Sequence, residues 1–349
     1  MLHLSAAVDQ PSAHDAGSYV ELARLAEEGV LDFVTLDDSF ARPGLDALAV
    51  LSRVAPGTKR VGLVPTVTTT HTEPFHVQAA VATLDWVSRG RAGWRLDVST
   101  TEGEARLFGR RHAAPADALW QEAGEVADVA AKLWDSWEDD AEIRDVPTGR
   151  FIDRDKLHHV DFEGTGFSVR GPSIVPRPPQ GHPVRAVDAT DGQARRTAAR
   201  YADVALVRSV SAAHARAVRE QLRERARLFG RDPAELRVFA SLVVDLGDGE
   251  HAAEPGHGGG GPRQTAQGPL YRGGPVDLAE LITAWHREGV VDGFHLTPTQ
   301  PRRDLERLVN GTVALLQHRG LFRTFYPGST LRDHLGLARP VSRYAGEVS

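Results

Sequence analysis

The chain has 349 residues and carries 41 Lys and Arg side chains against 47 Asp and Glu, a formal net charge of −6 at pH 7. This balance excludes the strongly basic surface with which many proteins bind nucleic acid, and the absence of cysteine excludes disulfides, thiolate metal sites and cysteine nucleophiles. Hydrophobic residues make up 41% of the chain, and its length allows two domains or one large α/β barrel.

Short apolar runs alternate with longer stretches of helical period from the first residues almost to the end. The strand-like runs lie near 2–8, 31–37, 60–67, 92–98, 183–188, 203–208, 236–245 and 291–296. The helical stretches lie near 16–28, 45–54, 76–88, 116–137, 192–201, 211–228, 276–288 and 302–319. Eight strand–helix units in one chain of this length predict a (β/α)₈ TIM barrel, because an open doubly wound sheet more often has fewer strands.

Two stretches interrupt the alternation. Residues 138–181 are rich in Asp, Gly and Pro, and residues 247–274 include the glycine run 258–261. We interpret them as insertions, one after the helix that follows strand four and one after strand seven. Glycines bury nothing that would offset their ordering entropy, so we expect the second insertion to be mobile. No second domain is indicated, and residues 1–349 are expected to form one barrel domain.

The start of the chain, Met1–Val8, has no basic region and no long apolar stretch before Asp9. It therefore does not resemble a signal peptide. No run of about 18 uncharged apolar residues occurs, so we expect no membrane span. A cytoplasmic protein is the expectation.

The residues that follow the predicted strands are the ones to inspect, because barrel active sites are built at the carboxyl ends of the strands. These positions are polar: Asp37 to Ser39, Thr66 to Glu73, Arg95 to Thr101, Asp188 to Gly192, and His295 to Thr297. Hydroxyls and short polar side chains suit a ligand that forms many hydrogen bonds.

Several of these residues also have a structural interpretation. Asp38 could cap the following helix, and Thr68 and Thr70 are types that favour strands in any case. His71 and His76 are five residues apart and do not share a helix face, so we expect no metal site there.

Other features narrow the function only slightly. Residues 190–193 open a predicted helix, whose amides favour an anion whatever the side chains are. Glu138–Asp140 is typical of a solvated surface, and periodicity does not decide whether His158 and His159 pack or line a site. No metal-ligand motif, nucleophile elbow, P-loop or dinucleotide fingerprint occurs. The residues alone predict a barrel enzyme with a polar mouth.

A family resemblance goes further. Glu73–His76, Leu84–Asp85 and Ser88–Trp94 resemble the segment that spans strands three and four in the bacterial luciferase-like flavin monooxygenases. Further stretches resemble the nitrilotriacetate, dibenzothiophene-sulfone and long-chain-alkane monooxygenases of that family: Leu133–Asp140, Phe167–Pro172, Pro176–Gly181, Arg319–Arg323 and Thr330–Gly336. The likeness covers most of the chain in register.

The resemblance implies a (β/α)₈ barrel that binds reduced FMN supplied by a separate NAD(P)H:flavin reductase. Oxygen reacts with the bound flavin, and a small organic substrate is oxygenated. In this chemistry the cofactor reacts, while the protein orients it and keeps water away. A homodimer is also implied.

By position, the resemblance assigns residues to the flavin. Asp38 corresponds to the family's acid after strand two, and Thr68 and Thr70 to hydroxyl residues beside the flavin ring. The phosphate loop after strand five corresponds to Thr190, Asp191 and Gly192. Arg95 and Ser99, on strand four and just after it, are the remaining expected contacts.

The chain also departs from the family pattern. Strand four usually carries an asparagine where this chain has Arg95, and Asp97 adds a second charge; Arg95 could pair with Asp97, or contact the flavin and attract an anionic substrate. Asp191 replaces a serine, and its carboxylate would repel a phosphate. His71 and His295 replace a tyrosine and an asparagine, and are our candidates for proton handling, since histidine titrates near neutrality unaided.

The segment after strand seven is shorter than in relatives, which implies a small lid. Two alternatives to the FMN-dependent enzyme therefore remain open. One is a flavin-free barrel that serves as a non-catalytic binding or partner subunit, and the other is an oxidoreductase that uses a deazaflavin.

Overall fold

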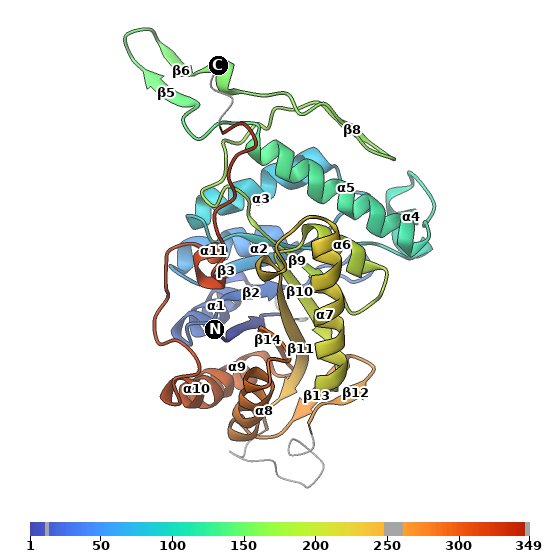
Figure 1. The fold of residues 1–349 in the computed structure, drawn as a ribbon, viewed down its shortest axis with the longest axis vertical. Coiled ribbons are helices and arrows are strands. Elements are labelled where there is room, and N and C mark those ends of the chain that lie inside the picture. Colours follow the sequence, from blue (N-terminus) through green and yellow to red (C-terminus); the bar gives the residue numbers. More distant parts are fainter. Residues whose placement is uncertain (11–13, 248–260, 346–349) are drawn as a thin grey trace.

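The computed structural model describes residues 1–10, 14–247 and 261–345. Eight parallel strands close into a barrel (Figure 1), because β14 pairs with β1 at one seam and β10 pairs with β11 at another. The eight strands are β1 (His3–Ala7), β2 (Phe33–Leu36), β3 (Gly62–Thr68), β4 (Gly93–Asp97), β9 (Val184–Asp188), β10 (Val204–Arg208), β11 (Arg237–Asp245) and β14 (Gly293–Pro298). All eight predicted strands are present, so the predicted TIM barrel is confirmed.

Helices cover the outside of the barrel at the predicted places. They are α1 (Ala16–Glu28), α2 (Ala47–Val54), α3 (Pro74–Ser88), α5 (Ala116–Asp135), α6 (Ala194–Tyr201), α7 (Ala212–Leu228), α8 (Pro275–Arg287), α9 (Pro301–Arg307) and α10 (Ala314–His318). The last predicted helix, 302–319, is divided into α9 and α10 by a π-helical stretch over Leu308–Val313.

Two short helices were not predicted, α4 (Glu102–Phe108) and α11 (Leu331–Leu335). Each begins with a capping box, in which Thr101 pairs with Glu104 and Thr330 with Asp333. The Thr-x-x-Glu/Asp spacing is the sequence signal that could have found them.

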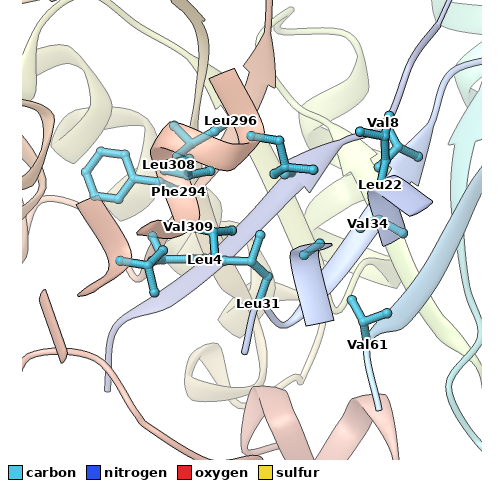
Figure 2. Packing of buried hydrophobic residues seen from close by; sticks show 14 of the residues in the cluster. Leu4, Val8, Leu22, Leu31, Val34, Val61, Phe294, Leu296, Leu308 and Val309 are labelled. Atoms are coloured by element: carbon cyan, nitrogen blue, oxygen red, sulfur yellow. The ribbon is translucent and has the colours of Figure 1, made fainter. Parts of the chain in front are cut away.

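The outer core lies between the strands and the helices. Side chains alternate across a strand, so Leu4 of β1 and Phe294 of β14 point outward and pack with Leu308 and Val309 of the π-helical stretch (Figure 2). These side chains are buried. This apolar layer forces the intervening residues of each strand into the barrel, which is what decides the lining of the site.

The lower half of the barrel interior is apolar. Phe33, Val184 and Phe239, near the amino ends of their strands, share a buried cluster with Leu331 and Leu335 of α11. Helix α11 thus covers the amino-terminal end of the barrel.

The two predicted insertions contain hairpins. Residues 138–181 form β5 (Glu142–Asp145) with β6 (Arg150–Ile152), which extend away from the barrel (Figure 1), and β7 (Phe162–Glu163) with β8 (Ser168–Val169). In the second insertion, β12 (Arg263–Thr265) and β13 (Gly268–Arg272) form a hairpin, and β13 extends the sheet beside β11. Residues 248–260, on which most of the expected mobility falls, lie outside the described residues. No helix in the described part of the chain is long and apolar enough to cross a membrane.

Candidate active site

A cavity of about 310 Å³ lies inside the barrel at the carboxyl ends of the strands. Its charged and polar lining comes from seven of the eight strands and the loops after them: Asp9, Asp37, Arg95, Asp97, Asp188, Asp191, Arg208, Ser241, His295 and Thr297. Gln267 and Pro269 of the β12–β13 hairpin also line it, as does Trp120 of α5. The predicted polar mouth is therefore a hollow large enough for a small ligand.

Strand β4 contributes two charges to the cavity, because Arg95 and Asp97 are two residues apart and point to the same side. The expected pair between them does not form in the described structure. Arg95 instead forms an ion pair with Asp37 at the end of β2, and Arg42 pairs with the other oxygen of Asp37. The strand register explains this choice. Leu36 pairs with Pro65 and Arg95 pairs with Thr66, so Asp37 and Arg95 lie at the same level of the barrel, two strands apart.

The carboxylates around Arg95 fall into two electrostatic groups. Burial opposes ionisation of Asp37 and Asp188, but their guanidinium partners outweigh it and hold each pKa below the usual range. The partner of Asp188 is Arg208, at 2.5 Å. Burial raises the pKa of Asp9 and of Asp97. The Asp37 backbone N–H compensates for burial only in part at Asp9, and Arg95 only in part at Asp97.

His295 lies deep in the cavity and is only 3% exposed. Its Nε2 is 2.8 Å from the Thr35 hydroxyl and its Nδ1 is 3.3 Å from the Ser241 hydroxyl. Burial, reinforced by the positive charge of Arg95, lowers the pKa of His295 to about 3. The imidazole is therefore neutral at physiological pH, and the reasoning that it titrates near neutrality is wrong for this residue.

His71 lies at the end of β3 and is nine-tenths buried. Its ring stacks on Phe108 of α4 at 4.9 Å, and neither ring nitrogen has a hydrogen-bond partner among the described residues. The backbone has φ of +67°, a strained value for a residue with a side chain. Burial, with a contribution from Arg111, lowers the pKa of His71. A buried, unsatisfied imidazole on a strained backbone is a feature that functional sites often contain.

The other residues expected near a flavin ring lie around the same mouth. Asp38 is half-buried, and its Oδ2 accepts the backbone N–H of Ala47, the first residue of α2, at 2.9 Å. This hydrogen bond corresponds to the helix-capping role considered for Asp38. Thr68 and Thr70 are buried, and the Thr70 hydroxyl accepts the backbone N–H of Ser99 at 3.1 Å. Neither Asp38 nor these hydroxyl residues line the cavity itself.

The expected phosphate loop lies at the rim, just before α6. Thr190 is held between its neighbours, since its N–H donates to Asp188 and its hydroxyl accepts the backbone N–H of Arg208. Asp191 is exposed and lines the cavity. A Cβ at Gly192 would meet no heavy atom within 4 Å, so the rim is open at this point.

Sequence reasoning missed Asp9 and Arg208, and it named Asp37 and Asp188 only within polar stretches, without a role in the site. Asp38 was chosen as the site residue instead of its neighbour Asp37. Side chains on a strand alternate between its two faces, so Asp37 points into the barrel as Thr35 does, and this alternation is the sequence signal that could have identified it. Ser241, two residues beyond the buried Phe239 on β11, follows the same rule.

In residues 1–10, 14–247 and 261–345, no group of three or more His, Asp or Glu side chains is arranged to hold a metal ion. The polar groups of the cavity are hydroxyls, carboxylates, two guanidiniums, one imidazole and the Gln267 amide. This set suits an organic ligand with many hydrogen-bonding atoms.

Comparison with known proteins assigns the family. The sequence profile of the luciferase-like monooxygenases matches residues 1–314. The chain belongs to the luciferase-like monooxygenase family. It is 31% identical to the N-acetyl-S-(2-succino)cysteine monooxygenase of Bacillus subtilis (strain 168), over 94% of this chain and 91% of that protein. It is also 31% identical to nitrilotriacetate monooxygenase component A of Aminobacter aminovorans, over 95% of this chain and 92% of that protein.

Solved structures agree on the fold. Long-chain alkane monooxygenase superposes with a TM-score of 0.84 at 22% identity, over 96% of this chain and 95% of that one. A riboflavin lyase, solved with modified FMN and riboflavin, superposes with a TM-score of 0.86 at 21% identity, over 99% of this chain and 98% of that one. The family and the barrel fold are thus both confirmed, and membership in this family identifies the protein as a flavin-dependent oxygenating enzyme.

Proposed function

We propose that this protein is a monooxygenase that uses reduced FMN and O₂ to oxygenate a small organic substrate in the barrel mouth. The observation that carries the proposal is the coincidence of family membership over residues 1–314 with a polar cavity at the carboxyl ends of the strands. Barrel enzymes place their chemistry at that end.

The residues at the mouth fit the ring of a flavin, a flat system with several carbonyl and nitrogen atoms. The two buried ring nitrogens of His71 have no partner in the described part of the chain. The neighbouring Thr68, Thr70 and Ser99 add hydroxyls. We assign these residues and Asp38 to the ring, and Arg95 to its polar edge from inside the cavity. A reduced flavin held there would supply two electrons, which together with two protons would convert one oxygen atom of O₂ to water while the other enters the substrate.

The chain's own residues hold the polar groups of the cavity in place and keep water out of it. Asp37 holds the Arg95 guanidinium in place, and Thr35 and Ser241 hold the His295 ring. Because both histidines have lowered pKa values, each is neutral at pH 7 and can accept or donate one hydrogen bond without carrying charge. Neutral His71 and His295 are our candidates to relay a proton to the reacting atoms without becoming cationic, each receiving it on one ring nitrogen while releasing one from the other. The β12–β13 hairpin contributes Gln267 and Pro269 as a cover that excludes water.

The phosphate of FMN is assigned to Thr190, Asp191 and Gly192. The open space at Gly192 and the start of α6 at Ala194 support this place, since helix amides favour an anion. The Asp191 carboxylate opposes it. We therefore expect weak retention of FMN, which agrees with a flavin that a separate NAD(P)H:flavin reductase delivers and takes back. The enzyme is further proposed to be a cytoplasmic homodimer of single-domain subunits.

One experiment tests the proposal. Purified protein is titrated with oxidised and with anaerobically reduced FMN while flavin fluorescence and thermal unfolding are followed. Binding in the micromolar range, with the reduced form bound more tightly, is expected. Failure to bind either form at high micromolar concentration would refute the proposal and favour the flavin-free partner subunit, for which the pairing of both cavity guanidiniums with carboxylates is the supporting observation. Tighter binding of a deazaflavin than of FMN would favour the deazaflavin enzyme.

A further inference from the structure

The cavity holds more negative than positive charge. Five carboxylates line it against two guanidiniums, and both guanidiniums are already engaged: Arg95 with Asp37, and Arg208 with Asp188. For the other three carboxylates, Asp9, Asp97 and Asp191, no cationic side chain lies within 4 Å in the part of the chain that the structure describes. A ligand that enters the cavity therefore meets an unneutralised negative potential.

Asp97 is the carboxylate best placed to contact a ligand. It projects into the cavity from the inner face of β4, directly beyond Arg95. Its Oδ1 accepts the backbone N–H of Val98 at 2.8 Å, which fixes the side chain. No described residue hydrogen-bonds to its Oδ2. Burial raises the pKa of Asp97, so a positive partner would restore stability that the carboxylate lacks when it is alone.

A second feature of the cavity wall indicates an organic cation. Trp120, Leu206, Val243 and Pro269 add apolar atoms to the lining of the cavity, including those of an indole ring. An alkyl group packs on such a surface, and a charged nitrogen is attracted both to an indole face and to a carboxylate. The described groups form no cluster that would hold a bare metal ion, so the match is to a cation that carries its own apolar part.

We propose that this cavity selects substrates with a positively charged nitrogen, such as a protonated alkylamine, and that Asp97 is the residue that determines this specificity. A substrate with carboxylate groups of its own is disfavoured, because it would add negative charge to a cavity in which both described guanidiniums, Arg95 and Arg208, already pair with carboxylates. The inference rests on the proposed function in taking the cavity as the substrate site.

The test uses three probes of one carbon skeleton, hexylammonium, hexan-1-ol and hexanoate, whose binding to the full chain is measured by calorimetry at pH 7.5. The expected result is that hexylammonium binds at least tenfold more tightly than hexanoate, with hexan-1-ol between them. Equal binding of the three, a preference for hexanoate, or no binding of hexylammonium at millimolar concentration overturns the inference.

The Asp97→Asn variant tests the residue. The amide oxygen can still accept the Val98 N–H, so the fold is retained, and unfolding curves verify this. The expected result is a loss of at least tenfold in hexylammonium affinity, while hexanoate binds as well as before or better. Asp155→Asn is the matched control, since it removes one negative charge at an exposed position of the insertion, and it should leave all three affinities unchanged. If Asp97→Asn keeps the full preference, or if Asp155→Asn loses it, the assignment to Asp97 is wrong. If Asp97→Asn does not fold, the wild-type comparison of the three probes alone decides the charge selectivity.

Titration of the same samples with reduced FMN separates the two proposals. Flavin binding together with a preference for hexanoate refutes only the inference about substrate charge. A hexylammonium preference without flavin binding supports the charge selectivity and refutes only the proposed oxygenase.

Discussion

Replacement of Arg95 by methionine tests the electrostatic account of the barrel mouth. Methionine keeps the length and much of the volume of arginine but removes the guanidinium that pairs with Asp37 from inside the barrel. The Arg95 side chain is 17% exposed and that of Asp37 is 28% exposed. Asp37 then keeps Arg42, whose side chain is 64% exposed. An exposed partner is screened by water and contributes little. The variant therefore leaves a largely unpaired carboxylate in the cavity.

The magnitude follows from this exposure. Removing one partner of a buried ion pair costs about 3–5 kcal/mol, because the other charge remains buried and uncompensated. Asp37 is partly hydrated and keeps a weak partner, so we expect a loss at the lower end, about 3 kcal/mol at pH 7. With a typical unfolding entropy of about 2.1 cal/mol/K per residue, the 349 residues convert this loss into a fall of about 4 °C in the unfolding temperature. Asp37→Asn in the same chain should recover most of it.

The pH dependence has a definite sign. In the wild-type protein the pKa of Asp37 is lowered, so its stabilising contribution is present above the unfolded pKa and is lost as pH falls. In Arg95→Met, burial dominates and raises the folded pKa, so stability is lost as pH rises above about 4. The difference between the two proteins should therefore be small at pH 4 and reach its full value at pH 7. Urea unfolding measured from pH 4 to 7 checks this, and a difference below about 1 kcal/mol, or one that does not change with pH, would refute the reasoning.

Three further outcomes are expected. Asp191→Ser should tighten FMN binding about fivefold and leave riboflavin unchanged, because a charge near a phosphate in water is worth about 1 kcal/mol; fluorescence titrations would contradict this if both ligands changed equally. Leu331→Ala, at the fully buried base of the barrel, should lower the free energy of unfolding by about 3 kcal/mol without altering flavin affinity, and a matching loss of flavin binding would argue against a site at the other end. Burial raises the pKa of Asp85 to about 6, above the unfolded value, so its contribution to stability is lost as pH rises from about 4 to 6. The stability difference between wild type and Asp85→Asn should fall by up to about 3 kcal/mol across that window, and a pH-independent difference in urea midpoints would show that Asp85 titrates normally.

The sequence by itself determined the barrel fold and the end of the barrel at which the polar site lies. Period-two apolar strands and helical stretches are local patterns, and the alternation of eight such units leaves few arrangements. The family motifs around Glu73–Trp94 were also readable directly, because they are contiguous. Even the two unpredicted short helices had a local signal in Thr101 and Thr330.

The tertiary structure decided which charges meet. Arg95 is two residues from Asp97 along the chain, yet it pairs with Asp37, 58 residues away, because strands β2, β3 and β4 lie side by side in the closed barrel. Burial likewise cannot be read from one position: His295 looks like a neutral-pH titrating group in the sequence, and enclosure beside Arg95 lowers its pKa to about 3. Partner choice and desolvation depend on groups that come together only when the barrel closes, which is why the sequence named the polar mouth but not its charge balance.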